Sequence, residues 1–169
     1  MNKIVLLDAS PLGMISNPSA TPANLECYNW MESLLMSGCQ IIVPEIADYE
    51  VRRELLRAGK TRGLARLDLL KNTLDYLPLT TDVMLKAAEL WAQARNQGTP
   101  MEDAKALDCD VILAAQALAA GGIVATENVG HLSLFVEAKD WRDILPVSQF
   151  TSLNQCNRAF RSINFERDF

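Results

Sequence analysis

Short runs of apolar residues alternate along this chain with longer segments in which apolar residues recur at helical spacing. The first run, from Ile4 to Leu7, is entirely apolar and leads into Asp8, which is typical of a buried parallel strand whose carboxyl end carries an acid. Further strands are predicted at residues 39–43, 76–79 and 123–125 and near Val147. Because helices connect the strands, the pattern predicts an α/β fold with three α/β/α layers and a mostly parallel central sheet.

Start and stop signals bound the helical segments. Ser10 followed by Pro11 predicts a helix with Ser10 as its N-cap, and Thr21-Pro22 opens a second helix that ends at Gly38. Further helices are predicted from Ile46 to near Gly59, over 64–74, from Thr81-Asp82 to Gly98, and over 111–118. The segment 99–107 is left without an assignment because it has no clear apolar face.

Length and composition favour a single domain. The chain has 169 residues, of which 49% are hydrophobic, enough to bury one sizeable core. We expect the domain to cover residues 1–150, with 151–169 forming a C-terminal tail or a short helix. The apolar run before Asp8 is too short for a signal peptide, and Gln116 and two glycines interrupt the stretch from Val111 to Ala125. A cytoplasmic protein with no membrane role is therefore expected.

The charge distribution bears on nucleic-acid binding. A net charge of −5 would repel a polyanion if it were spread evenly over the surface. Between Arg52 and Arg66, however, six basic residues stand against one acid, Glu54. This local surplus fits a nucleic-acid contact, and it also fits an ordinary solvated helix face.

Three acids that are far apart in the sequence are candidates for one site. The carboxyl ends of parallel strands lie side by side, so Asp8 can meet residues from distant segments. Asp110 stands at the start of a predicted apolar helix, and Glu50 lies one helical turn after Ile46, beside the apolar stripe of its helix. Clustered carboxylates must take up protons or bind a cation. Oxygen ligands favour Mg²⁺ or Mn²⁺, and the water on such an ion can attack a phosphodiester.

Each of these acids also has a purely structural explanation. Asp8 could form only a turn, Glu50 could be a solvated ion-pairing residue, and Asp110 or its neighbour Asp108 could be only a helix N-cap. The four cysteines form no Cys-x-x-Cys pair and the chain has one histidine, which argues against structural zinc and a disulfide framework. Spacing alone therefore makes a weak case for a metal site.

The order of several motifs resembles that of PIN-domain proteins. Residues 6–12 (LLDASPL) are similar to the family's opening, in which an acid ends the first strand and Ser or Thr follows two residues later. Residues 44–55 are similar to its second block, which carries a glutamate in the helix after the second strand. Residues 110–117 (DVILAAQA) and 123–132 (IVATENVGHL) resemble its Asp-plus-apolar-helix motif and its Thr-x-Asn/Asp strand end. The resemblance spans residues 4–148 in the expected order.

The resemblance implies a PIN-like ribonuclease that hydrolyses RNA with a divalent metal ion. The metal-binding and catalytic acids would be Asp8, Glu50 and Asp110, with Mg²⁺ bound and Mn²⁺ able to substitute. The polar neighbours that complete the site would be Ser10, Thr126 and Asn128. RNA phosphates would be contacted by Arg52, Arg53 and Arg57.

Many bacterial and archaeal members of the family are VapC-type toxins, so the resemblance also implies a small antitoxin partner and a homodimer. The chain departs from the fullest form of the pattern because Asn128 stands where many members have a fourth acid. Glu127, Asp108 and Asp140 are candidates to replace that acid. His131 resembles a family position near the site, but a lone histidine is more often structural.

Two other functions compete with a ribonuclease. Asn128 favours a non-catalytic PIN domain that binds RNA or a protein partner. An acidic α/β module of another kind, a phosphatase or a phosphate-accepting signalling domain, fits less well. The segment Asp8-Ala9-Ser10 lacks the second aspartate of an Asp-x-Asp phosphatase motif, and no acidic pair ends the first strand as in response-regulator receivers.

Overall fold

The structure is a computed structural model that describes residues 3–96 and 104–147. The predicted tail at 151–169, Cys156 and part of the unassigned segment 99–107 lie outside the described residues. No helix within the described residues is both long and apolar enough to cross a membrane.

A five-stranded sheet forms the centre of the molecule, and every strand pairing in it is parallel. Its strands are β1 (Ile4–Leu7), β2 (Gln40–Pro44), β3 (Asp75–Leu77), β4 (Ile123–Thr126) and β5 (Ala138–Asp140). Their order is β3-β2-β1-β4-β5, which places β1 and its following residue Asp8 in the middle. The predicted mostly parallel sheet is confirmed.

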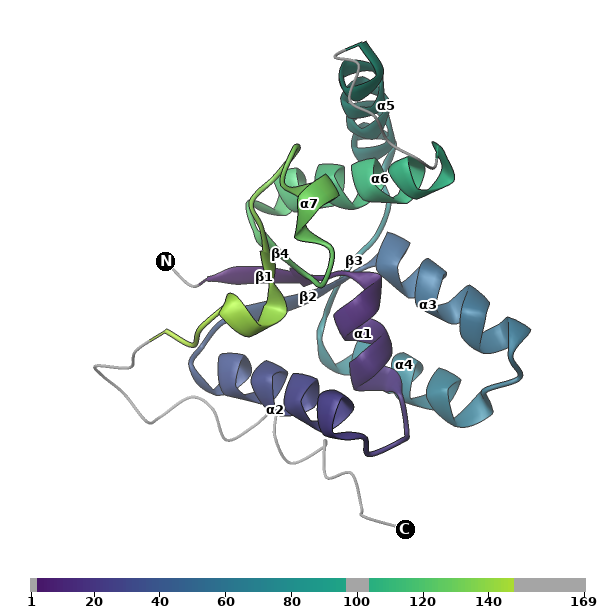
Figure 1. Ribbon diagram of the computed structural model, residues 1–169, viewed down its shortest axis with the longest axis vertical. Coiled ribbons are helices and arrows are strands. Elements are labelled where there is room, and N and C mark those ends of the chain that lie inside the picture. Colours follow the sequence, from purple (N-terminus) through teal and green to yellow (C-terminus); the bar gives the residue numbers. More distant parts are fainter. Residues whose placement is uncertain (1–2, 97–103, 148–169) are drawn as a thin grey trace.

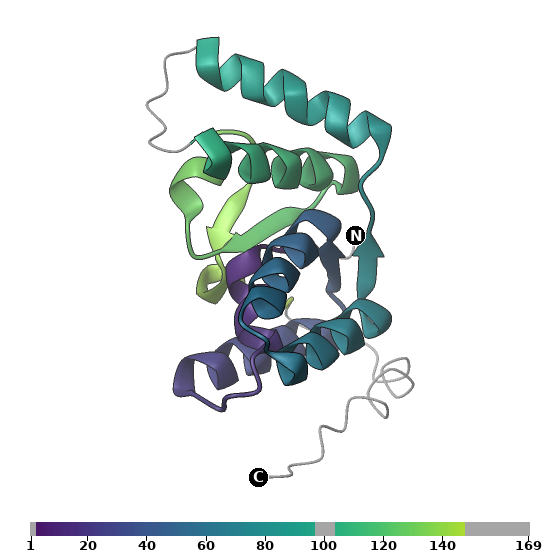
Figure 2. The same ribbon diagram turned by 90° about the vertical axis from the view of Figure 1, so that its right-hand side faces the viewer.

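Helices follow most of the strands and cover the sheet (Figures 1 and 2). They are α1 (Ala9–Ser16), α2 (Pro22–Met36), α3 (Glu45–Arg57), α4 (Thr61–Thr73), α5 (Thr81–Asn96), α6 (Ala104–Ala120), α7 (Val129–Leu132) and a 3-10 helix, η1 (Trp141–Asp143). The helix signal at Thr21-Pro22 is confirmed, because Thr21 caps α2 and Pro22 is its first residue. One or two helices connect each strand to the next, because parallel strands need a crossover connection that returns the chain to the same edge of the sheet.

The alternation of side chains along β1 divides the core into two faces. Val5 and Leu7 pack into a cluster with buried residues of α1, α2 and α4, whereas Leu6 packs with buried residues of α6 on the opposite side. Helix α5 packs on the outer side of α6 through a third apolar cluster and lies farthest from the sheet (Figure 1). This arrangement is the predicted three-layer α/β/α fold.

Three local predictions are wrong. Asp8, and not Ser10, is the N-cap of α1, because the helix begins directly after the strand. Helix α6 begins at Ala104, so Asp110 lies inside the helix and not at its positive end. The last strand among the described residues is β5 at Ala138–Asp140, which pairs with β4, and residues 144–147, leading up to the predicted position near Val147, form no strand.

Candidate metal and catalytic site

Asp8 joins the end of β1 to the start of α1. Its backbone N–H donates to the carbonyl of Ala125 (3.0 Å), which continues the pairing of β1 with β4 by one residue. Its Oδ1 accepts from the N–H of Ala9 (2.6 Å), and its Oδ2 accepts from the hydroxyl of Thr126 (2.7 Å). The helix and the neighbouring strand therefore fix both carboxylate oxygens at the carboxyl end of the sheet, where α/β proteins carry their sites.

Glu50 and Asp110 approach the same edge from two different helices. Glu50 lies on α3 and Asp110 on α6, and their side chains are 22% and 23% exposed. The negative charge of Asp8 acts on both, and Asp110 also feels the charge of Glu50. Asp108, in contrast, is exposed, which favours Asp110 as the inward-facing acid. The fold thus brings the three predicted acids into one electrostatic environment.

Burial and like charge make all three carboxyl groups harder to ionise. Burial is the largest cause in each case: it raises the pKa of Asp8 and of Glu50, and it is the main reason that the pKa of Asp110 rises to about 6. The charge of Asp8 adds to the shift at Asp110 and at Glu50. The hydrogen bonds from Thr126 and Ala9 act in the opposite direction on the pKa of Asp8.

The donor chemistry of this cluster fits a hard divalent cation, because carboxylate oxygens are the ligands that Mg²⁺ and Mn²⁺ prefer. The positions of the side chains, however, do not form a complete set of metal ligands. Among the described residues, no group of three or more His, Cys, Asp or Glu side chains is placed so that it could hold a metal ion. The acids are near enough to repel one another without surrounding a common point, and metal binding stays a prediction.

The polar neighbours tie the chain after β4 to α1. Thr126 is fully buried, and besides its bond to Asp8 its hydroxyl accepts from the N–H of Asn128 (2.9 Å). The hydroxyl of Ser10 accepts from the N–H of Glu127 (3.2 Å). The Asn128 side chain is exposed and does not cap α7. Thr126 therefore has a clear contact with the acid cluster, whereas the site roles of Ser10 and Asn128 stay predictions.

Two of the three candidates for a fourth acid are engaged elsewhere, and the third, Asp108, is exposed. Glu127 and Asp140 both pair with Arg142, at 3.5 Å and 3.3 Å. Arg142 also lies over the ring of Trp141, 4.1 Å from its centroid, next to the sheet edge at β5. These contacts give both acids a partner on the protein itself.

The three predicted RNA-binding arginines have different surroundings. Arg52 donates to Asp48 and to Asp68 (2.8 Å), so protein carboxylates already occupy its guanidinium. Arg53 lies 3.7 Å from Glu50, at the edge of the acid cluster, and Arg57 pairs with Glu54 on the exposed side of α3. Contact with RNA stays a prediction for all three, and the geometry favours Arg53 and Arg57 over Arg52.

Comparison with known proteins shows which family this chain matches. The PIN domain family matches residues 5–133, a range that contains all three acids. The chain belongs to the PIN domain family. The family match confirms the resemblance drawn from its motifs. No curated protein matches the sequence of this PIN domain.

Solved structures share the fold of this PIN domain at low sequence identity. VapBC2 from Rickettsia felis bound to promoter DNA is 17% identical, with 80% of this chain and 97% of that chain covered at a TM-score of 0.64. FitAcB from Neisseria gonorrhoeae is 20% identical, with 83% and 99% covered at 0.62. The sarcin-ricin-loop-cleaving toxin VapC20 of Mycobacterium tuberculosis is 14% identical, with 79% and 97% covered at 0.59. The likeness confirms the PIN fold.

Sequence reasoning missed two contacts of the acids in this PIN domain and the role of one buried polar residue. The thiol of Cys109 bonds to Glu50 and lowers the pKa of that carboxyl, while the pKa of Cys109 itself rises to about 12, mainly through burial. His131 Nδ1 lies 3.6 Å from Asp110 Oδ2. The motif resemblance placed His131 near the site without naming its partner, and no sequence signal pointed to the Cys109–Glu50 contact, because its partners come from different helices.

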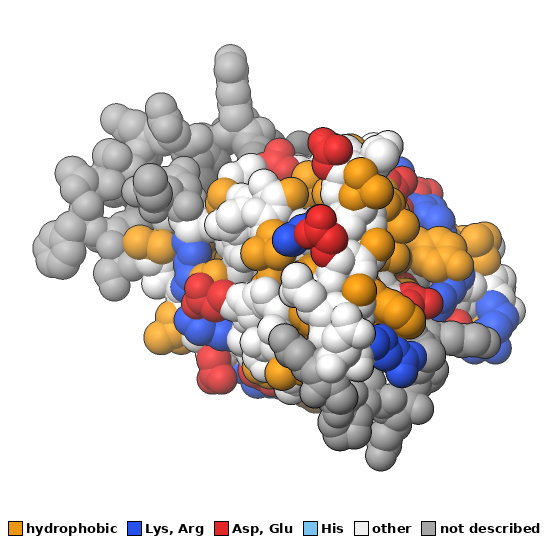
Figure 3. Space-filling view, turned by 90° about the horizontal axis from the view of Figure 1, so that it is seen from above, with side chains coloured by type: hydrophobic (Ala, Val, Ile, Leu, Met, Phe, Trp, Pro, Cys, Tyr) orange, Lys and Arg blue, Asp and Glu red, His pale blue; other side chains and the backbone are white. Residues whose placement is uncertain are grey.

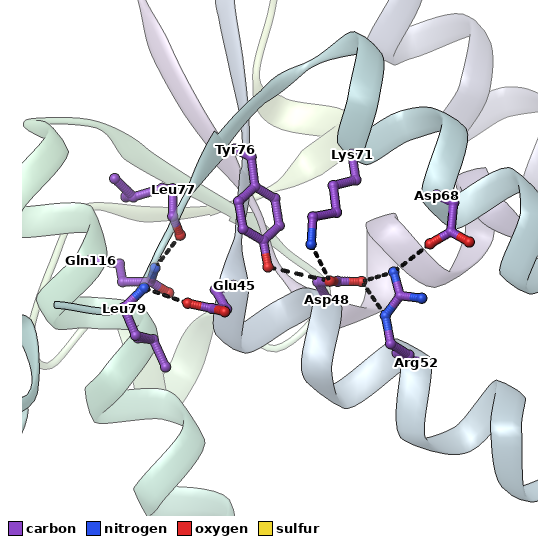
Figure 4. Close-up of polar contacts among 9 residues, drawn as sticks. All are labelled: Glu45, Asp48, Arg52, Asp68, Lys71, Tyr76, Leu77, Leu79 and Gln116. Atoms are coloured by element: carbon purple, nitrogen blue, oxygen red, sulfur yellow. Dashed lines mark hydrogen bonds and ion pairs between the residues drawn. The ribbon is translucent and has the colours of Figure 1, made fainter.

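Gln116 is the missed buried residue, and it bonds α6 to β3, as Figure 4 shows, and also to α3. Its Nε2 donates to the carbonyl of Leu77 (2.7 Å), and its Oε1 accepts from the N–H of Ile46 (3.4 Å), one turn before Glu50. The side chain is fully buried. A lone polar residue in the apolar run of α6 was the available signal for this contact.

Proposed function

We propose that this PIN domain is an endoribonuclease that hydrolyses RNA phosphodiesters with Mg²⁺ held by Asp8, Glu50 and Asp110. The observation that carries the proposal is that the carboxylates at the end of β1, on α3 and on α6 act on one another electrostatically. Asp8 raises the pKa of both other acids, and Glu50 raises that of Asp110. A cation shared by these groups would replace their repulsion with attraction. The VapC20 likeness supports RNA as the substrate, since that toxin cleaves the sarcin-ricin loop.

A bound Mg²⁺ would supply a Lewis acid for the phosphate and lower the pKa of an attacking water. The protein's own groups orient the acids. The Thr126 hydroxyl and the Ala9 N–H hold the Asp8 carboxylate in one rotamer, and the Cys109 thiol restrains Glu50. Arg53, beside Glu50, is positioned to hold a phosphate of the strand.

We further propose that the protein is the toxin of a toxin–antitoxin pair. Several solved relatives are VapBC or FitAB assemblies, which supports a small antitoxin as partner. A toxin that cuts cellular RNA would act in the cytoplasm, so we propose this location as well.

We also propose that the domain covers residues 1–150 and that residues 151–169 form a C-terminal tail or a short helix.

A homodimer is part of the proposal, and exposed apolar side chains on α5 and α6 support it. Met84, Leu85, Trp91 and Leu118 are 38–61% exposed on these two helices. Figure 3 looks down onto the end of the molecule where α5 lies and shows hydrophobic side chains exposed among charged ones. A second copy that packed there would remove this apolar surface from water.

The second candidate function is a non-catalytic PIN domain that binds RNA or protein. Two observations favour it: Asn128 in place of an acid, and the absence from the described residues of a closed metal-ligand group. Calorimetry with Mn²⁺ separates the two functions. Binding that is lost in Asp8→Asn indicates a metal site, whereas no binding by the unmodified protein favours the non-catalytic function.

Cleavage of single-stranded RNA by the purified protein tests the ribonuclease. We expect cleavage with Mg²⁺ or Mn²⁺, none with EDTA, and a loss of at least about 100-fold in Asp8→Asn and Asp110→Asn, since weakening even an outer contact of a metal site costs about 10–100-fold. Asp108→Asn is the matched control, because it removes the same charge from an exposed position of α6. Undiminished cleavage in both site variants would rule out this mechanism.

A further inference from the structure

A groove leads away from the acid cluster between α1, α3 and the start of α4. Its volume is about 880 Å³, and Ser10 and Glu50 line the end at the candidate site. From there it follows α3 to Arg57 and continues along residues 58–63. Helices α1, α3 and α4, whose residues line it, lie side by side in both ribbon views (Figures 1 and 2). Glu50 is therefore shared by the groove and the candidate site.

The far end of the groove carries positive charge that has no counter-ion among residues 3–96 and 104–147. Lys60 and Arg62 line it and are exposed, and neither has an ion pair within the described residues. Helix α4 begins beside them without an acidic residue in its first turn and without a side-chain cap. The partial positive charge of the helix N-terminus adds to that of the two cations.

We propose that this groove binds the single RNA strand as it leaves the cleavage site, with Lys60 and Arg62 contacting its phosphates. The inference rests on the proposed ribonuclease function. Glu50 and Arg57 lie about two helical turns apart, or roughly 10 Å along α3. Lys60 and Arg62, beyond Arg57, would therefore meet phosphates away from the bond that is cut.

Charge complementarity selects RNA as the occupant. Three carboxylates at the site repel a polyanion, so cations on either side of them must supply the attraction that holds the strand. Arg53 and Arg57 also line the groove, but each already has a carboxylate neighbour, Glu50 and Glu54. Lys60 and Arg62 are the lining cations that gain a full counter-charge when a phosphate binds.

The apolar lining of the groove indicates how the strand would be held. Val51, Leu55 and Gly13 lie along it and offer no side-chain hydrogen bonds to base edges. None of the described residues that line it is aromatic, so bases have no ring on which to stack. Without a stacking ring among the described lining residues, the phosphates supply the main contacts that hold the strand.

Salt-dependent binding of a single-stranded RNA of about 12 nucleotides tests the groove. The full chain is used in EDTA, where the labelled RNA stays intact and fluorescence anisotropy reports its affinity. The double variant Lys60→Gln/Arg62→Gln should bind about tenfold more weakly, and its slope of log affinity against log salt should be shallower by about 1.4, or 0.7 for each lost phosphate contact. Lys60→Arg/Arg62→Lys keeps both charges and should behave as the unmodified protein.

The matched control removes two charges from a surface far from the groove. Lys86→Gln/Arg95→Gln changes α5, where Lys86 pairs with Glu89 and Arg95 lies over the Trp91 ring. RNA affinity and salt slope that stay unchanged in the groove variant, or that fall equally in the control, would overturn the proposal. Unchanged RNA binding with weakened binding of a poly-glutamate peptide would assign the groove to an acidic protein segment instead. RNA binding without cleavage would refute the ribonuclease alone.

Discussion

Asp48 and Glu50 lie two residues apart on α3 and face opposite sides of the helix, and the protein treats their charges in opposite ways. The Asp48 side chain is only 6% exposed, yet it accepts two hydrogen bonds from Arg52 (3.2 and 3.0 Å) and one from Tyr76 (3.3 Å). Lys71 adds a second cation at 4.0 Å (Figure 4). The fold therefore supplies Asp48 with its own counter-charge.

Glu50 has a different set of neighbours. Its nearest cation is Arg53 at 3.7 Å, and Asp8 adds negative charge to that of the carboxylate. A buried acid with its own cations fixes the fold, whereas a cluster of acids with few cations has unused capacity to bind a positive ion. The comparison thus separates a structural carboxylate from functional ones on a single helix.

The largest expected effect on stability comes from removing the structural acid. Asp48→Ala should lower the free energy of unfolding by about 3 kcal/mol, because it leaves the partly buried Arg52 with fewer acceptors. Glu50→Gln is the matched change on the other side of α3 and should not lower it at pH 7, because burial raises the pKa of Glu50 and its ionisation opposes folding. Urea unfolding measures both. Equal losses in the two variants would abolish the distinction between them.

Removing a charge from the acid cluster should raise the free energy of unfolding at neutral pH, whereas removing Asp48 should lower it. Asp110→Asn is expected to raise the free energy of unfolding at pH 7 by about 2 kcal/mol in metal-free buffer, because ionising a carboxyl of raised pKa opposes folding. The ordinary aspartate pKa of 3.8, which applies to the unfolded chain, and the folded value of about 6 define the pH window. Below pH 3.8 the group is protonated in both states and the gain disappears; between the two values it grows, and above about 6 it is constant.

Urea titrations at pH 4 and pH 7 measure this difference. A gain of the same size at both values would mean that Asp110 affects stability through packing and not through its charge. The same shift predicts that Mn²⁺ affinity falls as the pH drops through about 6, because a proton then competes with the cation for Asp110.

The smallest expected effect concerns the hydroxyl that orients Asp8. Thr126→Val keeps the shape of the buried side chain but removes the 2.7 Å hydrogen bond to Asp8. Cleavage and Mn²⁺ affinity should each fall by about tenfold, the lower end of the range for an outer contact of a metal site. Thr126→Ser retains the hydroxyl and should restore both. A Val variant with unchanged Mn²⁺ affinity would show that Asp8 needs no such restraint.

Much of the fold could be predicted because the signals are local. The apolar run that ends at Asp8 indicated a central strand, and Thr21-Pro22 indicated the start of α2. The errors arose where a local signal competes with a contact made elsewhere. Ser10 looks like an N-cap, but Asp8 takes that place because its backbone is already fixed by pairing with β4. The short strand β5 has no clear apolar pattern in the sequence, and it forms because its backbone pairs with the free edge of β4.

The sequence by itself singled out three acids: Asp8 after an apolar strand, Glu50 beside the apolar stripe of its helix, and Asp110 next to an apolar helical run. Only the tertiary structure decided what surrounds each of them: Thr126 on Asp8, Cys109 on Glu50 and His131 beside Asp110. The tertiary structure also decided that Arg52 forms an ion pair with Asp48. The physical reason is that strand and helix patterns arise from neighbours along the chain, whereas the ionisation of a carboxyl depends on burial and on charges that folding brings from distant segments.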